Sequence, residues 1–201
     1  MSTIIVGITG ASGSVYAQKL LMELSANEHT IYLTVTEPGK RVLQEEINWQ
    51  IPADAREAEK VIRAYLNLQD DDKRLRYFDI NDVGALIASG SVKVDGMIII
   101  PCTMATVSAV AHGTASDLLE RAADVILKER RKLLIVPREA PLSAIHLENL
   151  LKLARMGVQI LPAMPAFYNK PQTIDDLVNF IVGRALDYFE IPHALYRRWE
   201  G

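Results

Sequence analysis

The sequence predicts an α/β protein with a central parallel sheet and helices on both faces. Short runs rich in β-branched residues recur along the chain between longer segments with helical spacing. These runs are continuously apolar rather than alternating, which is typical of parallel strands buried on both faces. The chain has 201 residues, of which 49% are hydrophobic and 23% charged, so it is long enough to bury one substantial core.

The individual elements follow in order along the chain. Each expected strand is an aliphatic run, and each expected helix is a longer segment beginning near a serine, alanine or isoleucine. The strands are expected at Thr3–Ile8, Thr30–Val35, Gly96–Ile100, Lys132–Val136 and Val158–Leu161, and the helices at Ser14–Ser25, Ala55–Leu68, Ala105–Ala111, Ser116–Arg130, Ser143–Met156 and Ile174–Phe189.

Composition excludes several classes of function. The net charge is -3 and the pI is near 5.8, so the chain lacks the basic character of nucleic-acid binders and small ligands are the expected partners. The aliphatic runs are too short to span a membrane, the N-terminus does not resemble a signal peptide, and the single Cys102 cannot form an intrachain disulfide. We therefore expect a cytoplasmic protein with one domain over residues 1–201. Its C-terminal segment 190–201 is expected to dock on the body or on a neighbouring subunit.

Two turns that follow expected strands carry groups suited to an anion. Gly7–Gly13 has the spacing G-x-x-G-x-x-G, which differs from the dinucleotide fingerprint, and it leads into the first expected helix. Ser12 either caps that helix or hydrogen-bonds a cofactor. Pro101–Thr106 repeats the arrangement, with Thr103 and Thr106 near a helix start, while Cys102 is expected as a small buried side chain. Two such turns at one sheet edge suggest one ligand that bridges them.

Arg138 and Glu139 follow the strand that ends at Val136, where ligands bind in open parallel sheets. They are either a cation for a phosphate beside a proton carrier or a structural ion pair. Arg121 and Lys128 are seven residues apart on one expected helix face, which could grip a phosphate. The other cations of residues 128–132 are expected to complement a helix end. The four histidines share no metal-ligand spacing, so no metal site is predicted.

A set of motifs spread over the whole chain resembles the UbiX-type flavin prenyltransferases, formerly described as aromatic-acid or 3-polyprenyl-4-hydroxybenzoate decarboxylases. The order and spacing of the motifs make the resemblance specific. They are Ile8–Gly13, Pro101–Thr103, Arg121–Val125, Leu127–Arg131, Val136–Pro141, His146–Leu147, Pro165–Tyr168 and the closing Arg198–Trp199.

The resemblance implies a three-layer Rossmann or flavodoxin-like enzyme that forms homo-oligomers, dodecamers in the family. It implies transfer of a dimethylallyl group from dimethylallyl monophosphate to N5 and C6 of reduced FMN, without a metal. The prenylated FMN would serve a UbiD-type decarboxylase, including the one of ubiquinone biosynthesis.

The resemblance also assigns roles to residues. The expected FMN site consists of Gly10, Ala11, Ser12, Thr36, Thr103, Met104, Ala105, Thr106 and Arg138. The expected dimethylallyl phosphate site consists of Ser89, Gly90, Arg121, Lys128, Glu139, Tyr168 and Arg184. Of the catalytic residues, Lys128 would stabilise the departing phosphate and Glu139 would protonate it, while Glu46 and Ser12 would help remove the flavin ring proton. Trp199 is expected to steady an allylic cation.

Several positions depart from the family pattern. Glu37–Gly39 replaces a segment that usually opens with Ser-Lys, Ala105 stands where lysine is frequent, and Val83 stands where some members have an aromatic residue. The flavin pocket is therefore expected to differ in detail. The pair Glu45–Glu46 leaves the acidic residue ambiguous by one position, and spacing from Thr36 favours Glu46.

Three alternatives remain open from the sequence. The first is an FMN-dependent decarboxylase of the same fold, although its Asn-Met substrate motif is not found. The second is a noncatalytic FMN carrier, which would need Gly10–Gly13 and Arg138 but not Glu139. The third is a nicotinamide oxidoreductase, for which the glycine spacing is wrong.

Overall fold

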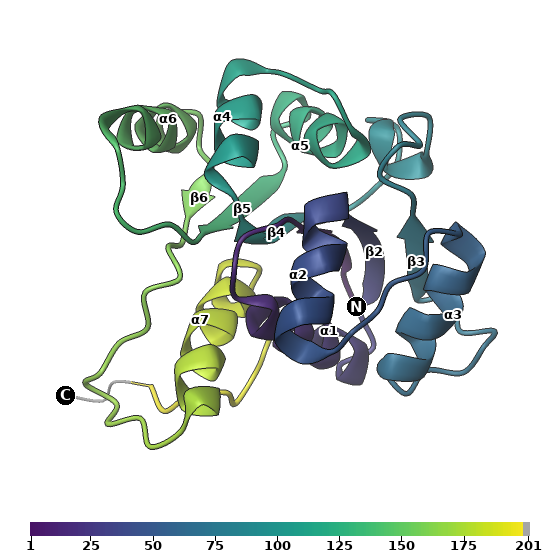
Figure 1. The fold of residues 1–201 in the computed structure, drawn as a ribbon, viewed down its shortest axis with the longest axis horizontal. Helices are drawn as coiled ribbons and strands as arrows, with labels where there is room; N and C mark the ends of the chain where they lie inside the picture. The colour runs from purple at the N-terminus through teal and green to yellow at the C-terminus, as the bar shows by residue number, and fades with distance from the viewer. Residues whose placement is uncertain (199–201) are drawn as a thin grey trace.

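The structure is a computed structural model that describes residues 1–198. Its centre is a sheet of six parallel strands in the order β3-β2-β1-β4-β5-β6 (Figure 1). The order reverses direction between β1 and β4, which makes this the switch point at which such sheets bind ligands. The strands are β1 (Thr3–Ile8), β2 (Thr30–Val35), β3 (Leu75–Phe78), β4 (Gly96–Cys102), β5 (Lys132–Pro137) and β6 (Gln159–Ile160).

Helices cover both faces of the sheet and complete three layers, as Figure 1 shows. On one face lie α1 (Ser14–Ala26), α2 (Glu37–Ile47), α3 (Ala55–Tyr65) and α7 (Ile174–Tyr188). On the other lie α4 (Met104–His112), α5 (Leu118–Lys128), α6 (Ala144–Arg155) and the short 3-10 turn η1 (Leu86–Ala88). The predicted α/β class with a central parallel sheet is confirmed.

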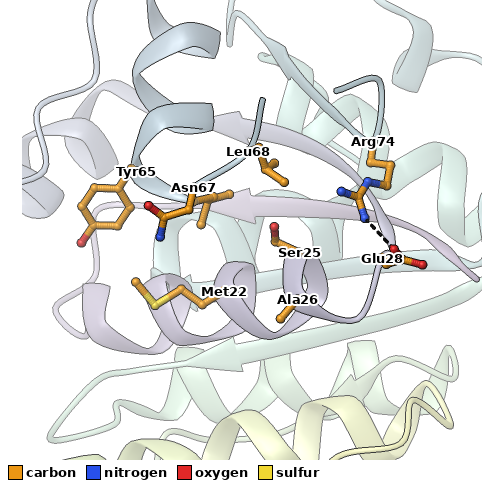
Figure 2. A pocket seen from close by; sticks show the side chains of 9 residues that line it. Met22, Ser25, Ala26, Glu28, Tyr65, Asn67, Leu68 and Arg74 are labelled. Atoms are coloured by element: carbon orange, nitrogen blue, oxygen red, sulfur yellow. Dashed lines mark ion pairs between the residues drawn. The ribbon is translucent and has the colours of Figure 1, made fainter. Parts of the chain in front are cut away.

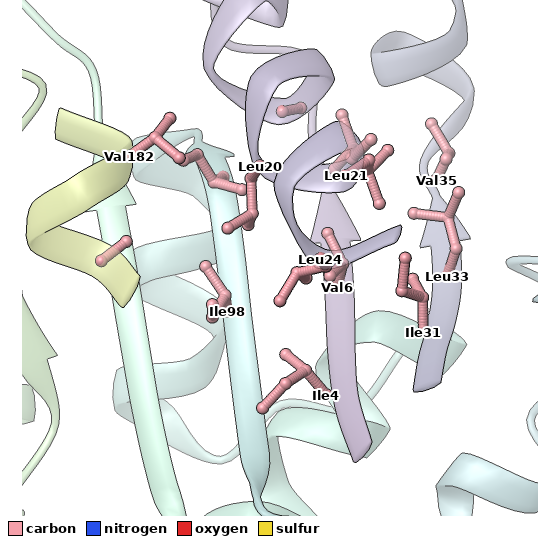
Figure 3. Close-up of a cluster of buried hydrophobic side chains, with 14 of the residues drawn as sticks. Ile4, Val6, Leu20, Leu21, Leu24, Ile31, Leu33, Val35, Ile98 and Val182 are labelled. Carbon is pink, nitrogen blue, oxygen red and sulfur yellow. The ribbon is translucent and has the colours of Figure 1, made fainter. Parts of the chain in front are cut away.

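The buried strands explain why the sequence reads as continuous apolar runs. Ile4, Val6 and Ile98 point to the side of α1 and α7 (Figure 3), while Ile5 and Ile99 point to the side of α4 and α5. Each of these side chains is almost fully buried. Burial at this scale contributes roughly 1.5–3 kcal/mol per large aliphatic side chain, so the sheet is the rigid frame on which the loops are mounted.

The structure corrects several expected elements. Helix α2 and strand β3 were not predicted: α2 has Pro38 and Gly39 in its first turn, and β3 has only four residues. Proline is well tolerated in the first turn of a helix, where its missing amide has no partner to lose. The expected helix Ser116–Arg130 is shorter, because the side chain of Asp117 caps α5 by accepting a hydrogen bond from the Glu120 amide. The expected helix Ala55–Leu68 ends at Tyr65, and the expected strand Val158–Leu161 is reduced to β6.

Residues 191–198 lie against α7, where Ile191 joins the buried core and Asp187 binds three side chains of the segment. Asp187 accepts hydrogen bonds from His193 Nε2 at 3.1 Å, Tyr196 Oη at 2.5 Å and Arg198 Nη2 at 2.7 Å. The tail approaches so closely that a Cβ on Gly183 would lie 2.6 Å from the Tyr196 ring. Trp199, the residue expected to steady an allylic cation, lies outside the described residues.

Candidate functional site

Four loops meet at the carboxyl edge of the sheet, and buried Thr9 joins the first two. The hydroxyl of Thr9 donates to the carbonyl of Pro101 at 2.8 Å and accepts from the Thr103 amide at 2.8 Å. The loop after β1 is thereby tied to the loop after β4 at the switch point. The two turns predicted to bind a ligand, Gly7–Gly13 and Pro101–Thr106, therefore lie next to each other.

Arg138 joins the loop after β5 to the same cluster. Its amide donates to the Cys102 carbonyl at 3.2 Å, and its side-chain Nε donates to the Ser12 carbonyl at 3.2 Å. The exposed guanidinium therefore lies over the β1–α1 loop, available to an anion. Glu139 follows it and is also exposed, with Oε1 accepting from the Ala140 amide at 3.1 Å. Arg138 and Glu139 form no ion pair with each other, so the structural ion-pair interpretation is wrong.

Glu46 reaches from α2 to the beginning of α1. Its Oε2 accepts from the Gly13 amide at 2.9 Å and the Ser14 amide at 2.7 Å. Partial burial raises the pKa of Glu46, but hydrogen bonds from Ser12, Ser14 and Gly13 outweigh this and hold the pKa below that of an ordinary glutamate. The anion at this helix end is thus the protein's own carboxylate. Ser12 is not the N-cap, a position held by Gly13 with φ 115°.

Two further helices begin at this edge and direct their first amides into it. Thr36 is the N-cap of α2 and accepts from the Gly39 amide at 3.1 Å, while Thr103 is the N-cap of α4 and accepts from the Thr106 amide at 3.2 Å. The β1–α1 loop lies close to α2, because a Cβ on Gly10 would be 2.5 Å from the Pro38 side chain. Together with Arg138, these amides and hydroxyls form a donor set that suits a phosphate and a polar ring edge.

Buried Cys102 ends β4 beneath this cluster. Its side chain is fully buried, and burial raises the pKa of its thiol far above the ordinary value. A thiol in this state is a weak nucleophile. The structure thus confirms the expectation of a small buried side chain.

One hollow lies away from the carboxyl edge. Figure 2 shows it, with a volume of about 450 Å³, between the last turn of α1 and the end of α3, lined by Met22, Tyr65 and Arg74 among others. Arg74 lies 3.8 Å from Glu28 there and is also paired with Asp72. These residues precede β2 and β3, at the amino edge of the sheet, and none of the predicted site residues lines this hollow.

Comparison with known proteins identifies the family. A family model described as Flavoprotein matches residues 1–186. The flavin prenyltransferase UbiX of Alkalihalophilus pseudofirmus is 51% identical over 194 residues, which are 96% of this chain and 94% of the relative. The chain belongs to the UbiX-type flavin prenyltransferases. The resemblance inferred from the motifs is confirmed.

Solved structures of UbiX-type relatives support the same assignment. AnUbiX (PadA1), crystallised with FMN and dimethylallyl pyrophosphate, is 37% identical with a TM-score of 0.88 and covers 100% of this chain and 98% of its own. A protein from Escherichia coli O157:H7, described as a dodecameric FMN-dependent UbiX-like decarboxylase, is 42% identical with a TM-score of 0.85. The match covers 99% of this chain and 100% of that one.

A second group of the predicted UbiX-type site residues lies around the end of α5. A Cβ on Gly90 would be 2.9 Å from Lys128 Nζ, so the loop at Ser89 and Gly90 touches this lysine. Lys128 pairs with Glu129 at 2.6 Å. Arg131 fastens the loop by donating to the carbonyls of Gly90 at 2.7 Å and Val92 at 2.6 Å. The loop at Ser89 and Gly90 therefore lies beside Lys128 in the structure.

A third group lies along α7. The ring of Tyr168 packs edge-on against Phe180, with centroids 6.1 Å apart, and both Tyr168 and Arg184 are exposed. Arg184 lies 3.5 Å from Asp187, the carboxylate that holds residues 191–198. A hydrogen bond with the Tyr196 hydroxyl raises the pKa of Arg184 above that of an ordinary arginine.

The three groups do not meet within one chain. Lys128 ends α5 just before β5 begins, whereas Arg138 follows the end of β5. A strand of six residues spans roughly 17–20 Å, so these two cations lie at opposite edges of the sheet. Arg121, in the first turn of α5, is about 10 Å from Lys128 along the helix axis and pairs with Asp124 at 3.1 Å. The expected dimethylallyl phosphate site, which joins Lys128 to Glu139, is therefore not assembled within a single copy.

Three residues that organise these groups were missed from the sequence: Thr9, Arg131 and Asp187. Thr9 gave a recognisable signal, a hydroxyl directly after a buried strand and before a glycine. Arg131 was attributed to helix-end complementation, and nothing local distinguishes Asp187 from a solvated acid. Their partners are between 6 and 94 positions away, which a local pattern does not reveal.

Two further observations concern the described residues alone. No group of three or more His, Cys, Asp or Glu side chains in residues 1–198 is arranged to hold a metal ion. Within the same range, none of the helices combines the length and the apolar character needed to cross a membrane.

Proposed function

We propose that this protein transfers a dimethylallyl group from dimethylallyl monophosphate to N5 and C6 of reduced FMN, and so makes prenylated FMN. The observation that carries the proposal is the cluster at the carboxyl edge. There Arg138 lies over the Ser12 carbonyl while Glu46 is held at the same loop. The FMN-binding and UbiX-type relatives support this assignment of the cluster.

The FMN site is proposed at this cluster, on Gly10, Ala11, Ser12, Thr36, Arg138 and the turn 103–106. When bound, reduced FMN supplies the nucleophilic nitrogen and carbon of its ring. Arg138 and the first amides of α2 and α4 would hold its phosphate, since the first amides of α1 are already bound to Glu46. The chain departs from the family pattern at Glu37–Gly39 and at Ala105, but these departures leave the backbone donors in place.

The acid and base roles follow from the chemistry of the transfer. The bond between the allylic carbon and the phosphate oxygen breaks as that carbon bonds to N5, which loses its proton, and Glu139 is assigned the proton that the departing phosphate takes up. The second bond forms between C6 and the branched carbon of the prenyl double bond. That double bond breaks and its other carbon gains a proton, while the proton displaced at C6 passes toward Ser12 and Glu46. The lowered pKa of Glu46 keeps its carboxylate ionised and able to accept hydrogen bonds at neutral pH.

The donor site is proposed on Ser89, Gly90, Arg121, Lys128, Tyr168 and Arg184, together with Glu139. Because Lys128 and Arg138 lie at opposite edges of one sheet, the donor site is proposed to form between copies of the chain. One copy would supply the FMN cluster, and neighbours would supply Lys128 and Arg184. A homo-oligomer, with twelve copies as the proposed number, is supported by the dodecameric relative from E. coli. A UbiD-type decarboxylase in the same cytoplasm is the proposed recipient of the product.

The decisive experiment measures the mass of the flavin after anaerobic reaction. Purified protein, reduced FMN and dimethylallyl monophosphate are expected to yield a flavin heavier by one prenyl unit. An unchanged flavin mass would contradict the proposal. A parallel reaction with dimethylallyl diphosphate tests the donor, because the relative AnUbiX was crystallised with the diphosphate.

The decarboxylase and carrier alternatives are separated by two measurements. The E. coli relative is described as a decarboxylase, so release of carbon dioxide from an aromatic acid by the protein and FMN alone would favour that reading. The variant Glu139→Gln tests the carrier: we expect FMN binding to persist while prenyl transfer falls by about 100-fold, as for loss of a general acid. Full transfer activity in this variant would remove Glu139 from the acid role.

A further inference from the structure

Helix α6 presents an apolar surface that no other part of the described chain covers. Its inner side buries Asn149 and Leu153, and it packs against α4 and β6. On its outer side Leu147 and Leu151, one turn apart, are 53% and 50% exposed, and Met156 just past its end is 50% exposed. Figure 1 shows α6 at the periphery of the molecule, beyond α4. Large aliphatic side chains this exposed, close together on one helix, are typical of an interaction surface.

Charged residues share this outer face with the aliphatic ones. Glu148, Lys152 and Arg155 border a hollow of about 460 Å³ together with Leu151 and Met156. Within residues 1–198, none of these three charges takes part in an ion pair. The face therefore offers both signs of charge without internal partners, next to a hollow that an incoming side chain can fill.

The pattern is complementary to itself under a twofold rotation. An axis that passes between Leu151 and Lys152 and is perpendicular to α6 would bring a second, antiparallel α6 against the first. Positions on the contacting face whose numbers add to the same value then lie at the same level across the axis. Glu148 and Arg155, two helical turns apart on this face, would each face the other residue in the second copy, and Leu151 would lie beside its own counterpart near the axis. The contact between Glu148 and Arg155 would occur twice, as an isologous interface requires.

We propose that the outer face of α6 is a twofold interface between two copies of this chain, centred between Leu151 and Lys152. The opposite charges at Glu148 and Arg155 identify the occupant as a second copy in antiparallel orientation. In a parallel pairing in register, each of these charges would face its own kind. Closed assemblies of twelve with tetrahedral or dihedral symmetry contain twofold axes, and a relative 42% identical to this chain is dodecameric.

The proposed face is separate from the contact that would complete the reaction site. The site needs the carboxyl edge of one copy to meet the end of α5 of another, which are different surfaces and form a head-to-tail contact. The α6 contact instead joins the same face of two copies. A head-to-tail contact that closes into a ring, combined with a twofold contact between rings, gives a larger closed assembly.

Charge reversal tests the pairing directly in the full-length protein. We expect Glu148→Arg and Arg155→Glu, made singly, to lower the mass of the assembly by at least twofold in native mass spectrometry and sedimentation. The double variant Glu148→Arg/Arg155→Glu restores both ion pairs with reversed sign and is expected to regain the wild-type mass. Glu57→Arg, at an exposed glutamate on α3, is the matched control and should leave the mass unchanged. Circular dichroism checks that every variant is folded.

Two outcomes would overturn the proposal. If both single reversals keep the wild-type mass, α6 is not an interface between copies. If the single reversals reduce the mass but the double variant fails to restore it, Glu148 and Arg155 do not face each other and another surface occupies α6.

Discussion

At the residue scale, Glu46 shows what the sequence could and could not provide. The motif resemblance indicated an acidic residue at this position, and spacing from Thr36 favoured Glu46 over Glu45. The structure adds the reason: Glu46 faces the Gly13 and Ser14 amides, whereas Glu45 pairs with Arg41 at 2.8 Å on the outside of α2. That distinction depends on α2, which sequence reasoning missed because Pro38 and Gly39 interrupt the expected helical pattern.

Replacing Glu46 should affect both stability and chemistry. We expect Glu46→Ala to lower the free energy of unfolding by about 1 kcal/mol, because it removes the acceptor at the beginning of α1. Prenyl transfer should fall by about 100-fold, as for loss of a proton-accepting group. Glu45→Ala is the matched control and should change stability by less than about 0.5 kcal/mol. Equal losses of transfer activity in both variants, measured by flavin mass, would refute the assignment to Glu46.

At the element scale, the loop 89–92 and the end of α5 behave as one unit. Arg131 holds the Gly90 and Val92 carbonyls, and Ser89 Oγ lies 2.8 Å from Ser91 Oγ within the loop. The family resemblance put Ser89, Gly90 and Lys128 in one expected donor site. It could not supply Arg131, because the bonds to Val92 and Gly90 span 39 and 41 positions.

A methyl group at position 90 should disturb Lys128 without unfolding the protein. Its Cβ would lie 2.4 Å from Glu129 Oε1 and 2.9 Å from Lys128 Nζ, the far ends of two flexible side chains that can move. We expect Gly90→Ala to raise the KM for the prenyl donor severalfold while the melting temperature changes little. Gly84→Ala, where the nearest atom is Asp82 Oδ1 at 3.6 Å, should leave both unchanged. An unaltered donor KM in Gly90→Ala would argue against a donor site at this loop.

Asp187 is the main charged group at the junction between α7 and residues 191–198. Burial acts to raise the pKa of Asp187, but hydrogen bonds from Tyr196, Arg198 and His193 outweigh it and lower the pKa to about 2. A depressed carboxylate pKa stabilises the folded state above the unfolded value near pH 4, and this contribution is lost as the pH falls through the folded value.

The pH dependence of Asp187 can be measured by urea unfolding. Asp187→Asn is expected to be less stable than wild type by roughly 2 kcal/mol at pH 6, and the difference should shrink between about pH 4 and pH 2. Asp175→Asn, in the first turn of the same helix, should follow the wild-type curve. A difference for Asp187→Asn that stays constant down to pH 2 would show that charge on Asp187 does not hold the tail.

At the scale of the whole molecule, the sequence predicted the layers of the fold but not the division of the site. Continuous apolar runs such as Met97–Ile100 determine a parallel sheet almost by themselves. The placement of Lys128 depends instead on the direction of α5, which runs from the carboxyl edge back to the amino edge. The sequence placed Lys128 and Glu139 in one donor site by resemblance, but it does not show that they lie at opposite edges of the sheet of a single copy.

Mixed assemblies should reveal whether neighbouring copies share the site. Arg138→Ala and Lys128→Ala are each expected to abolish most prenyl transfer when expressed alone. Because each intact residue can come from a different copy, co-expression of the two variants should restore a measurable part of the activity. The control is a chain that carries both substitutions, co-expressed with either single variant, in which at most one residue type is available. No recovery in the mixed assemblies would indicate that each copy acts alone.

The two edge strands of the sheet are both short. Strand β3 has four residues and β6 has two, so few peptide groups at either border lack a neighbouring strand. A strand from another chain would therefore find few unpaired backbone groups with which to extend the sheet. Filaments built by edge-to-edge stacking are therefore disfavoured, and crowded copies should remain dispersed rather than precipitate as amyloid.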